Sequence, residues 1–252
     1  MTAIDAKEHQ DKICEKHGKY VSQHIQLGKV CDFWSRCSEC EAGKKREEEA
    51  AWKRQQREEW IVRLVKNAQI PARFFGKSFS DYVATNEGQR RALSAATDCC
   101  ERFTDHLAAG RCMVFSGRPG TGKTMLGCCI AQSIARSGHA ALYITVTELV
   151  RWLRSSWGGA AGDSESTVLR KLADLALLVV DEVGVQFGSD AELAQLTEVI
   201  DLRYRRMRPT LVISNCAPEE LARYLGARGV DRLRENGGKV VIFDWPSHRG
   251  GT

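Results

Sequence analysis

One eight-residue stretch of this 252-residue chain has the residue types and spacing of a phosphate-binding loop. Residues 117–124 complete the pattern GxxxxGK[ST], directly after an apolar run and before a helical period. Glycines let backbone N–H groups turn toward phosphates, and the helix N-terminus adds partial positive charge. Lys123 is expected to bridge the phosphates, and Thr124 to offer its hydroxyl to Mg²⁺. The predicted nucleotide-binding residues are Gly117, Arg118, Pro119, Gly120, Thr121, Gly122, Lys123 and Thr124.

A second, acidic motif supplies groups that could hold Mg²⁺ and activate water. An apolar run ends in Asp181 and Glu182, where the edge of a parallel sheet is expected. Asp181 is predicted to coordinate Mg²⁺ through water, and Glu182 to polarise the attacking water, so the pattern predicts a hydrolase. The alternative is that both are ordinary charges at a strand end. Asn215 ends the next apolar run and is a candidate γ-phosphate sensor, or only a helix N-cap before Pro218.

Two close pairs near the N-terminus have the spacing of a zinc site. Cys14 and His17 form one pair and Cys37 and Cys40 the other, and each pair can fold into a turn that aims two ligands at one tetrahedral ion. The soft Cys₃His set favours zinc over magnesium or calcium, and four protein ligands make the site structural. Cys31 could replace His17, and free reduced cysteines are the alternative to any metal.

Short apolar runs alternate with helical periods from residue 72 onward, which predicts a parallel sheet covered by helices on both faces. The expected strands are 112–116, 141–146, 175–180, 210–214 and 239–243. Helices are expected at 122–136, from a cap at Thr147 to 157, from a capping box at Ser189 to 207, and from Pro218. A surface loop is expected at 158–167.

Charge and composition divide the chain into three parts. Residues 41–66 are rich in Lys, Arg and Glu and predict a solvated helix that docks at its C-terminal end. The expected domains are a zinc-binding module at 1–42, a charged helix at 43–70 and an ATPase domain at 71–252. A net charge of +5 permits a polyanionic partner without requiring one.

The chain shows no sequence feature of a membrane or secreted protein. Its apolar runs are shorter than a membrane span of ~18 residues, and its first residues lack an apolar signal core. We therefore expect a cytoplasmic protein with no membrane partner and with reduced thiols. The cysteines outside the metal motif are expected to be small core residues: Cys99, Cys100, Cys112, Cys128, Cys129 and Cys216.

Several further segments carry a family resemblance: 181–186 (DEVGVQ), 208–210 (RPT), 225–228 (LGAR), 231–234 (DRLR) and 241–249 (VIFDWPSHR). Together with the phosphate loop, they resemble the AAA+ ATPases of the DnaC-type replicative helicase loaders, from about residue 74 to 249. The resemblance implies the AAA+ P-loop NTPase fold, a three-layer αβα arrangement, and ATP as the nucleotide. The cysteine set departs from the family's best-known member, although related loaders, including phage-type ones, carry zinc at the N-terminus.

The resemblance also implies roles for two arginines. Arg232 matches the arginine finger that reaches the ATP of a neighbouring subunit, which implies self-association through the ATP site, and Arg249 matches the second sensor near the γ-phosphate. Such a cation from a neighbour stabilises transition-state charge. Arg228 and Arg234 are competing candidates for the finger.

Loaders of this family bind single-stranded DNA through a helical insertion that matches residues 147–157. Arg151, Arg154 and Trp157 would neutralise phosphates and stack on bases there, unless Trp157 is a core residue. A further basic cluster is expected on a solvated helix face, with contact to DNA or to a neighbouring subunit as the alternative: Arg203, Arg205, Arg206 and Arg208.

The resemblance therefore implies a protein that binds the hexameric, DnaB-type replicative helicase and loads it onto single-stranded DNA, with ATP hydrolysis driving release. One rival is a transposition helper ATPase of the IstB type, which acts on duplex DNA with a transposase. A second rival is a zinc-dependent adaptor with negligible turnover, against which the intact Glu182 argues.

Overall fold

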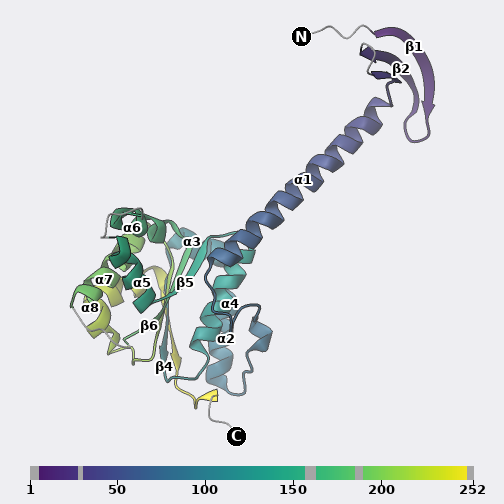
Figure 1. The fold of residues 1–252 in the computed structure, drawn as a ribbon. Helices are drawn as coiled ribbons and strands as arrows, with labels where there is room; N and C mark the ends of the chain where they lie inside the picture. Colours follow the sequence, from purple (N-terminus) through teal and green to yellow (C-terminus); the bar gives the residue numbers. More distant parts are fainter. Residues whose placement is uncertain (1–5, 28–30, 157–162, 185–189, 249–252) are drawn as a thin grey trace. The chain divides into compact units, whose positions relative to one another are not determined.

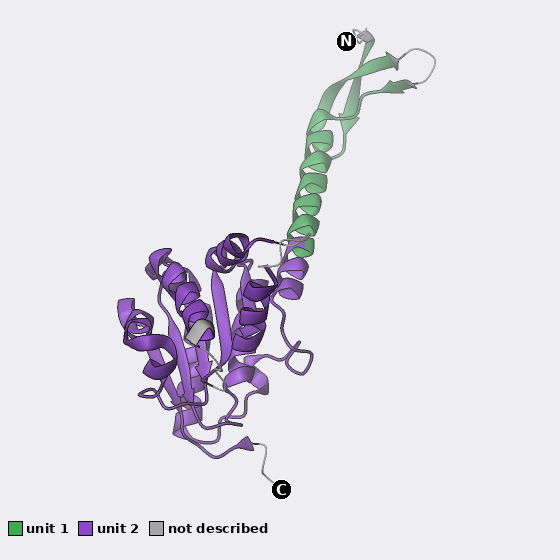
Figure 2. Cartoon of the chain, turned by 60° about the vertical axis from the view of Figure 1, so that its left-hand side comes forward, with its two compact units in different colours: residues 1–59 green, residues 60–252 purple. Residues whose placement is uncertain are grey.

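The computed structural model describes residues 6–27, 31–156, 163–184 and 190–248. The chain forms two compact units, residues 1–59 and residues 60–252 (Figure 2). Each unit is described below by itself.

The first unit contains a small antiparallel sheet that the sequence did not predict. Strands β1 (Ala6–Cys14), β2 (Gly18–Leu27) and β3 (Cys31–Trp34) pair in that order. A tight turn joins β1 to β2, and Gly18 takes a left-handed φ of 79° as the chain enters β2. The turn places Cys14 and His17 close together at one end of the sheet.

Helix α1 (Ser38–Asn67) confirms the charged helix expected at 41–66 and extends it at both ends. None of its residues is buried, as expected for a solvated helix. Lys44 and Glu48 form an i,i+4 ion pair at 3.7 Å on its surface. In the second unit the ring of Trp60 lies against Gly138, where a Cβ would approach it to 2.9 Å.

The second unit is built on a five-stranded parallel sheet in the order β5-β6-β7-β4-β8. Its strands are β4 (Met113–Gly117), β5 (Ala141–Thr145), β6 (Leu177–Val183), β7 (Thr210–Ser214) and β8 (Lys239–Phe243). All five predicted strands are present, two of them with the predicted bounds. The carboxyl ends of β4, β6 and β7 meet at one edge of the sheet, where a ligand site is expected.

Helices cover both faces of this sheet (Figure 1). One face carries α2 (Glu87–Glu101), α3 (Phe103–Ala109) and α4 (Lys123–Arg136). The other carries α5 (Val146–Ser155), α6 (Glu165–Asp174), α7 (Asp190–Arg205) and α8 (Leu221–Arg234). Short 3₁₀ turns lie at Phe79–Asp81 and Glu235–Gly237. Two buried apolar clusters, one on each side of the sheet, form the core of the predicted three-layer αβα arrangement.

Several predicted helix boundaries are wrong. Thr145, not Thr147, caps α5. The Thr145 hydroxyl accepts a hydrogen bond from the Glu148 backbone N–H, and the Glu148 carboxylate accepts one from the Thr145 backbone N–H. Helix α6 occupies the last part of the segment expected to be a loop, because Ser164 caps it by accepting from a backbone N–H. Helix α8 begins at Leu221 rather than near Pro218. Ser189 lies outside the described residues, and α2 and α3 were not predicted.

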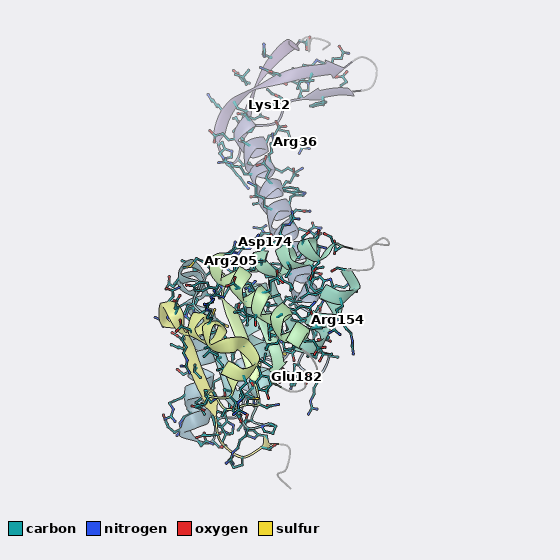
Figure 3. The ribbon with its side chains drawn as sticks, turned by 90° about the vertical axis from the view of Figure 1, so that its left-hand side faces the viewer. Lys12, Arg36, Arg154, Asp174, Glu182 and Arg205 are labelled. Carbon is teal, nitrogen blue, oxygen red and sulfur yellow. The ribbon has the colours of Figure 1, made fainter. Side chains whose placement is uncertain are left out.

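The expectation that Arg203 lies on a solvated helix face is also wrong. Its side chain is fully buried, and its guanidinium donates to Thr210 Oγ1 and to three backbone carbonyls. Arg205, the last residue of α7, and Arg206, which follows it, do lie at the surface, where they pair with Asp201 and with Asp174 of α6 (Figure 3 labels Arg205 and Asp174). Of the predicted core cysteines, Cys99, Cys112, Cys128 and Cys129 are buried, whereas Cys100 and Cys216 are half-buried.

Among the described residues, no helix combines the length and the apolar character that crossing a membrane requires.

Candidate functional site

The predicted phosphate loop connects β4 to α4 at the carboxyl edge of the sheet. Gly117 has a φ of 131°, and a Cβ there would lie 2.3 Å from the carbonyl oxygen of Phe243, so only glycine fits. Lys123 is almost fully buried, and its ammonium donates to the carbonyls of Gly117 at 2.7 Å and Arg118 at 2.6 Å. The ammonium group of Lys123 thus lies inside the turn of the phosphate loop.

A second segment, close to the C-terminus, braces this loop. The Arg118 N–H donates to the Phe243 carbonyl at 2.8 Å, and the His248 N–H donates to the Gly120 carbonyl at 2.9 Å. The indole N–H of Trp245 donates to the Thr121 carbonyl at 3.1 Å. These contacts fix the loop backbone through one of its N–H groups and two of its carbonyls. Trp245 and His248 were not predicted to brace the loop, although both lie in the segment that carried the family resemblance.

The acidic pair lies directly beside the loop. The Thr124 hydroxyl donates to Asp181 Oδ2 at 2.8 Å, and Asp181 is 3% exposed. A loop hydroxyl next to a buried carboxylate is the oxygen set that Mg²⁺ takes in nucleotide sites, where waters and phosphates complete the octahedron. The residues present therefore fit the metal that the sequence predicts.

Glu182 follows Asp181 in an unusual backbone conformation. Its φ is 64°, and the pairing of β6 with β7 is irregular between Val180 and Val183. A left-handed non-glycine residue stores strain and is found most often at functional sites. Burial, and then the carboxylates of Asp181 and Glu148, raise the pKa of Glu182 above its ordinary value. A carboxylate of raised basicity beside a phosphate loop suits activation of water.

These groups line a cavity of about 460 Å³, a size typical of a small-molecule site. Five residues of the loop line it: Pro119, Gly120, Gly122, Lys123 and Thr124. Asp181, Glu182 and Asn215 line the same cavity, so the structure brings four of the six predicted catalytic residues together, Lys123 being the fourth. Glu182 is labelled in Figure 3.

The far wall of the cavity was not predicted from the sequence. It is formed by a segment ahead of α2, and its lining residues include Arg73, Phe74, Asp81, Tyr82 and Val83. Val83 is 66% exposed there although it is apolar, and the Tyr82 hydroxyl reaches back to the Thr121 carbonyl at 3.3 Å. This segment has no helical or strand period and no motif, so only the three-dimensional structure identifies it.

The predicted arginine finger lies outside the cavity of its own chain. Arg232 on α8 forms an ion pair with Asp201 of α7, and its guanidinium lies over the Tyr204 ring at 5.2 Å. The competing candidates Arg228 and Arg234 are exposed on the same helix. The predicted second sensor, Arg249, lies outside the described residues.

The predicted DNA-contacting residues lie on α5 and just after it. Arg151 is exposed, whereas Arg154 forms an ion pair with Glu192 of α7 at 3.1 Å (Figure 3). Trp157 lies outside the described residues.

In the first unit, the structure brings the four predicted metal ligands together. One ligand atom from each of Cys14, His17, Cys37 and Cys40 lies within 4.8 Å of the others. The Cys14 and Cys40 sulfurs are 3.5 Å apart, and the His17 Nδ1 is 3.4–3.7 Å from all three sulfurs. Ligand bonds of ~2.3 Å to one tetrahedral ion would place the sulfurs about 3.7 Å apart.

Two further features of the cluster suit a metal. The other ring nitrogen of His17, Nε2, lies 3.5 Å from the carboxylate of Glu39, the outer contact that orients most metal-binding histidines. Hydrogen bonds from the backbone N–H groups of Lys16 and His17 lower the pKa of the Cys14 thiol to about 6. The hydrogen bond with Cys14 raises the pKa of the Cys40 thiol to about 11, so Cys14 ionises first. The side chain of Cys31, the alternative ligand, is not among those described.

Comparison with known proteins identifies the family. The family described as IstB-like ATP binding protein matches residues 41–230. The replicative helicase loader DnaC of Escherichia coli (strain K12) is 37% identical over 172 residues, which are 68% of this chain and 69% of that one. The chain belongs to the IstB/DnaC-like family. The E. coli protein YdaV resembles this family member at 35% identity over 208 residues, 82% of this chain and 81% of that one.

A solved structure confirms the fold of this IstB/DnaC-like chain. The crystal structure of the DnaC helicase loader is 21% identical and superposes with a TM-score of 0.62, over 69% of this chain and all of that chain. The second unit therefore has the AAA+ P-loop NTPase fold that the sequence predicts. The family to which the chain belongs is described as ATP binding.

Proposed function

We propose that this protein binds the hexameric, DnaB-type replicative helicase and loads it onto single-stranded DNA, with ATP hydrolysis driving release. The observation that carries the proposal is the 37% identity, over two thirds of the chain, to proteins named replicative helicase loader. The assembled cavity supports it, because a phosphate loop, two adjacent acids and a polar residue at the end of β7 line one site.

In the proposed reaction five of the cavity residues have a direct role. Lys123 exchanges the carbonyls of Gly117 and Arg118 for phosphate oxygens, Asp181 and Thr124 hold Mg²⁺, and Glu182 accepts a hydrogen bond from the attacking water. Bound Mg²⁺ supplies positive charge that offsets the developing charge on the phosphate oxygens. Asn215, which directly follows β7, contacts the γ-phosphate and so acts as the sensor that distinguishes ATP from its hydrolysis product.

Self-association would complete the site. We place Arg232 of one subunit in the ATP site of the next, and Arg249 near the γ-phosphate of its own chain. Arg232 would have to leave Asp201 and Tyr204 to do so, so assembly and hydrolysis would be coupled.

The Cys14, His17, Cys37 and Cys40 cluster would hold a structural Zn²⁺. Its tetrahedral spacing and the Glu39 contact support this assignment. Zinc would tie the first sheet to the start of α1, since Cys14 ends β1 and Cys40 lies in the first turn of α1.

We assign the proposed functions to three segments of the chain. Residues 1–42 form the zinc-binding module, 43–70 the charged helix and 71–252 the ATPase domain. The module and the helix would contact the helicase, while Arg151, Arg154 and Trp157 would contact single-stranded DNA. Arg154 would exchange its partner Glu192 for a DNA phosphate.

A loading assay on circular single-stranded DNA tests the proposal. A closed helicase ring cannot thread onto a circle unless it is opened, so DNA-bound helicase after gel filtration measures loading. We expect loading only when this protein and ATP are both present. The Glu182→Gln variant should bind ATP and helicase yet stay on the DNA with the helicase.

Two results would contradict the proposal. One is helicase recovery on the circle that this protein does not raise. The other is ATP-dependent binding to duplex DNA with recruitment of a transposase, which would establish the transposition helper instead.

A further inference from the structure

Three hydrogen-bond donors converge on the carboxylate of Asp181. The Thr124 hydroxyl donates to Oδ2 at 2.8 Å, and the Glu182 backbone N–H donates to Oδ1 at 2.7 Å. The third donor is the hydroxyl of Tyr143 on β5, 2.7 Å from Oδ2. Tyr143 belongs to none of the motifs that identify the ATP site.

The fold places the Tyr143 hydroxyl at this point with little freedom. Tyr143 pairs with Val179 in the parallel register of β5 and β6, two residues before Asp181, so the three side chains lie on one face of the sheet. Its ring is 5% exposed within the core under α4. Its backbone N–H is held by the Ala68 carbonyl at 2.9 Å.

The hydrogen bond between the Tyr143 hydroxyl and the Asp181 carboxylate is favourable for both groups. Burial, and then the charge of Asp181, raise the pKa of Tyr143 far above its ordinary value, so the phenol remains a donor. If Asp181 turned away, a buried hydroxyl would lose its partner, which is costly. The carboxylate and the phenol therefore hold each other in place.

The three contacts also decide which oxygen remains available. A carboxylate oxygen has two lone-pair sites. Among the described residues, the hydroxyls of Tyr143 and Thr124 fill both sites of Oδ2, whereas Oδ1 accepts only from the Glu182 N–H and has one site left. The free site on Oδ1 is the one that can accept from a metal-bound water.

We infer that Tyr143 is a positioning residue of the ATP site, whose hydroxyl fixes the orientation of the Asp181 carboxylate and thereby sets the Mg²⁺ requirement for nucleotide binding. The inference rests on the proposed Mg²⁺-dependent ATP site. Tyr143 contacts neither nucleotide nor metal and acts only through Asp181.

The test is a titration of the full chain with a fluorescent ATP analogue, in EDTA and over a range of MgCl₂ concentrations. Tyr143→Phe removes one hydroxyl and keeps the ring. We expect its affinity in EDTA to stay within about twofold of wild type. The Mg²⁺ concentration that gives half of the metal-dependent tightening should rise about tenfold, the effect of one hydrogen bond to a charged group.

Two further variants separate positioning from a general structural effect. In Asp181→Asn, adding Tyr143→Phe should not change the Mg²⁺ requirement further, because the carboxylate is already gone. Tyr82→Phe is a matched control: its hydroxyl donates to a loop carbonyl, so it should change affinity equally with and without Mg²⁺.

Three outcomes would overturn the inference. If wild type and Tyr143→Phe need the same Mg²⁺ concentration for half of the tightening, this inference is overturned and the proposed ATP site is not affected. An equal loss of affinity in EDTA and in Mg²⁺, which is the mark of a structural role, also overturns it. Wild-type protein that binds the analogue without any response to Mg²⁺ overturns both this inference and the proposed ATP site.

Discussion

At the scale of single residues, Arg203 makes a buried polar network in the ATPase unit. Its guanidinium donates to the carbonyls of Leu172, Leu175 and Pro209 and to Thr210 Oγ1. Leu172 lies in the last turn of α6 and Leu175 directly follows the helix, so these carbonyls carry the partial negative charge of its C-terminus. The buried cation thus joins α6, α7 and the start of β7, and no carboxylate of the described residues pairs with it.

Replacing Arg203 should therefore destabilise the ATPase unit strongly. Arg203→Lys keeps the charge but loses the planar fork that reaches four acceptors, and we expect it to lower the free energy of unfolding by about 3 kcal/mol. Arg205→Lys, at an exposed ion pair on the same helix, should cost less than about 0.5 kcal/mol. Urea unfolding followed by circular dichroism measures both; equal midpoints would contradict this account.

The buried side chain of His106 should make the free energy of unfolding depend on pH. Its side chain is buried, its Nε2 has no hydrogen-bond partner among the described residues, and burial followed by the charge of Arg111 lowers its pKa. Arg102 and Lys239 act in the same direction, and Asp98 opposes them. The unfolded state, with an ordinary pKa of about 6.5, binds a proton before the folded state does, so stability falls as pH drops below that value.

The test compares wild type with His106→Gln. Over pH 7.5 to 5.5 the melting temperature of wild type should fall more than that of the variant, because glutamine does not titrate. Parallel pH profiles of the two proteins would show that His106 does not contribute.

The residues that carry motifs could be predicted because their chemistry demands a given type at a given spacing. Lys123, Thr124 and Asp181 are of this kind. Tyr143 and Trp245 could not be predicted in the same way. They reach the site from segments distant in sequence, and neither belongs to a motif whose chemistry requires that residue type at that position.

At the scale of elements, strands of the sheet were predictable because continuous apolar, β-branched runs such as 210–214 fit a strand buried on both faces. The start of α5 was misplaced although a signal existed: Thr145 has Glu148 three residues later, the pattern of a capping box, and Thr147 does not. The first sheet was missed because β1 and β2 are mostly polar and alternate only weakly.

Helix α8 is interrupted ahead of Arg232, the proposed arginine finger. Gly226, with a φ of 67° and a ψ of 157°, breaks the helix, and Arg232 lies in the part after the break. A residue with a Cβ is disfavoured at this φ, so the break needs glycine. The second part of α8 packs against α7 through the Arg232 and Asp201 ion pair.

We expect Arg232→Ala to keep nucleotide binding. Its rate of cooperative, DNA-stimulated ATP hydrolysis should fall about 10³-fold. Arg228→Ala and Arg234→Ala, exposed on the same helix, are matched controls and should change turnover less than about threefold. Mixing Arg232→Ala with Lys123→Ala should restore activity, since each variant supplies what the other lacks. Unaltered turnover in Arg232→Ala would remove this residue from the site.

At the scale of the whole molecule, the zinc module should determine helicase binding. Cys37→Ser should abolish bound zinc, measured by elemental analysis, and weaken helicase binding at least tenfold, because the start of α1 is no longer held to β1. Cys216→Ser, which lies outside the cluster, should keep both. Loss of zinc with unchanged helicase binding would contradict the proposed role of the module.

The central claim is that this chain is an ATP-dependent loader of a hexameric helicase. Its most direct test is size-exclusion chromatography with light scattering on the protein mixed with the hexameric helicase of its own cell, with and without ATP and Mg²⁺. The account predicts a stable complex of several loader subunits per hexamer that changes with nucleotide. No complex under any nucleotide condition would contradict it.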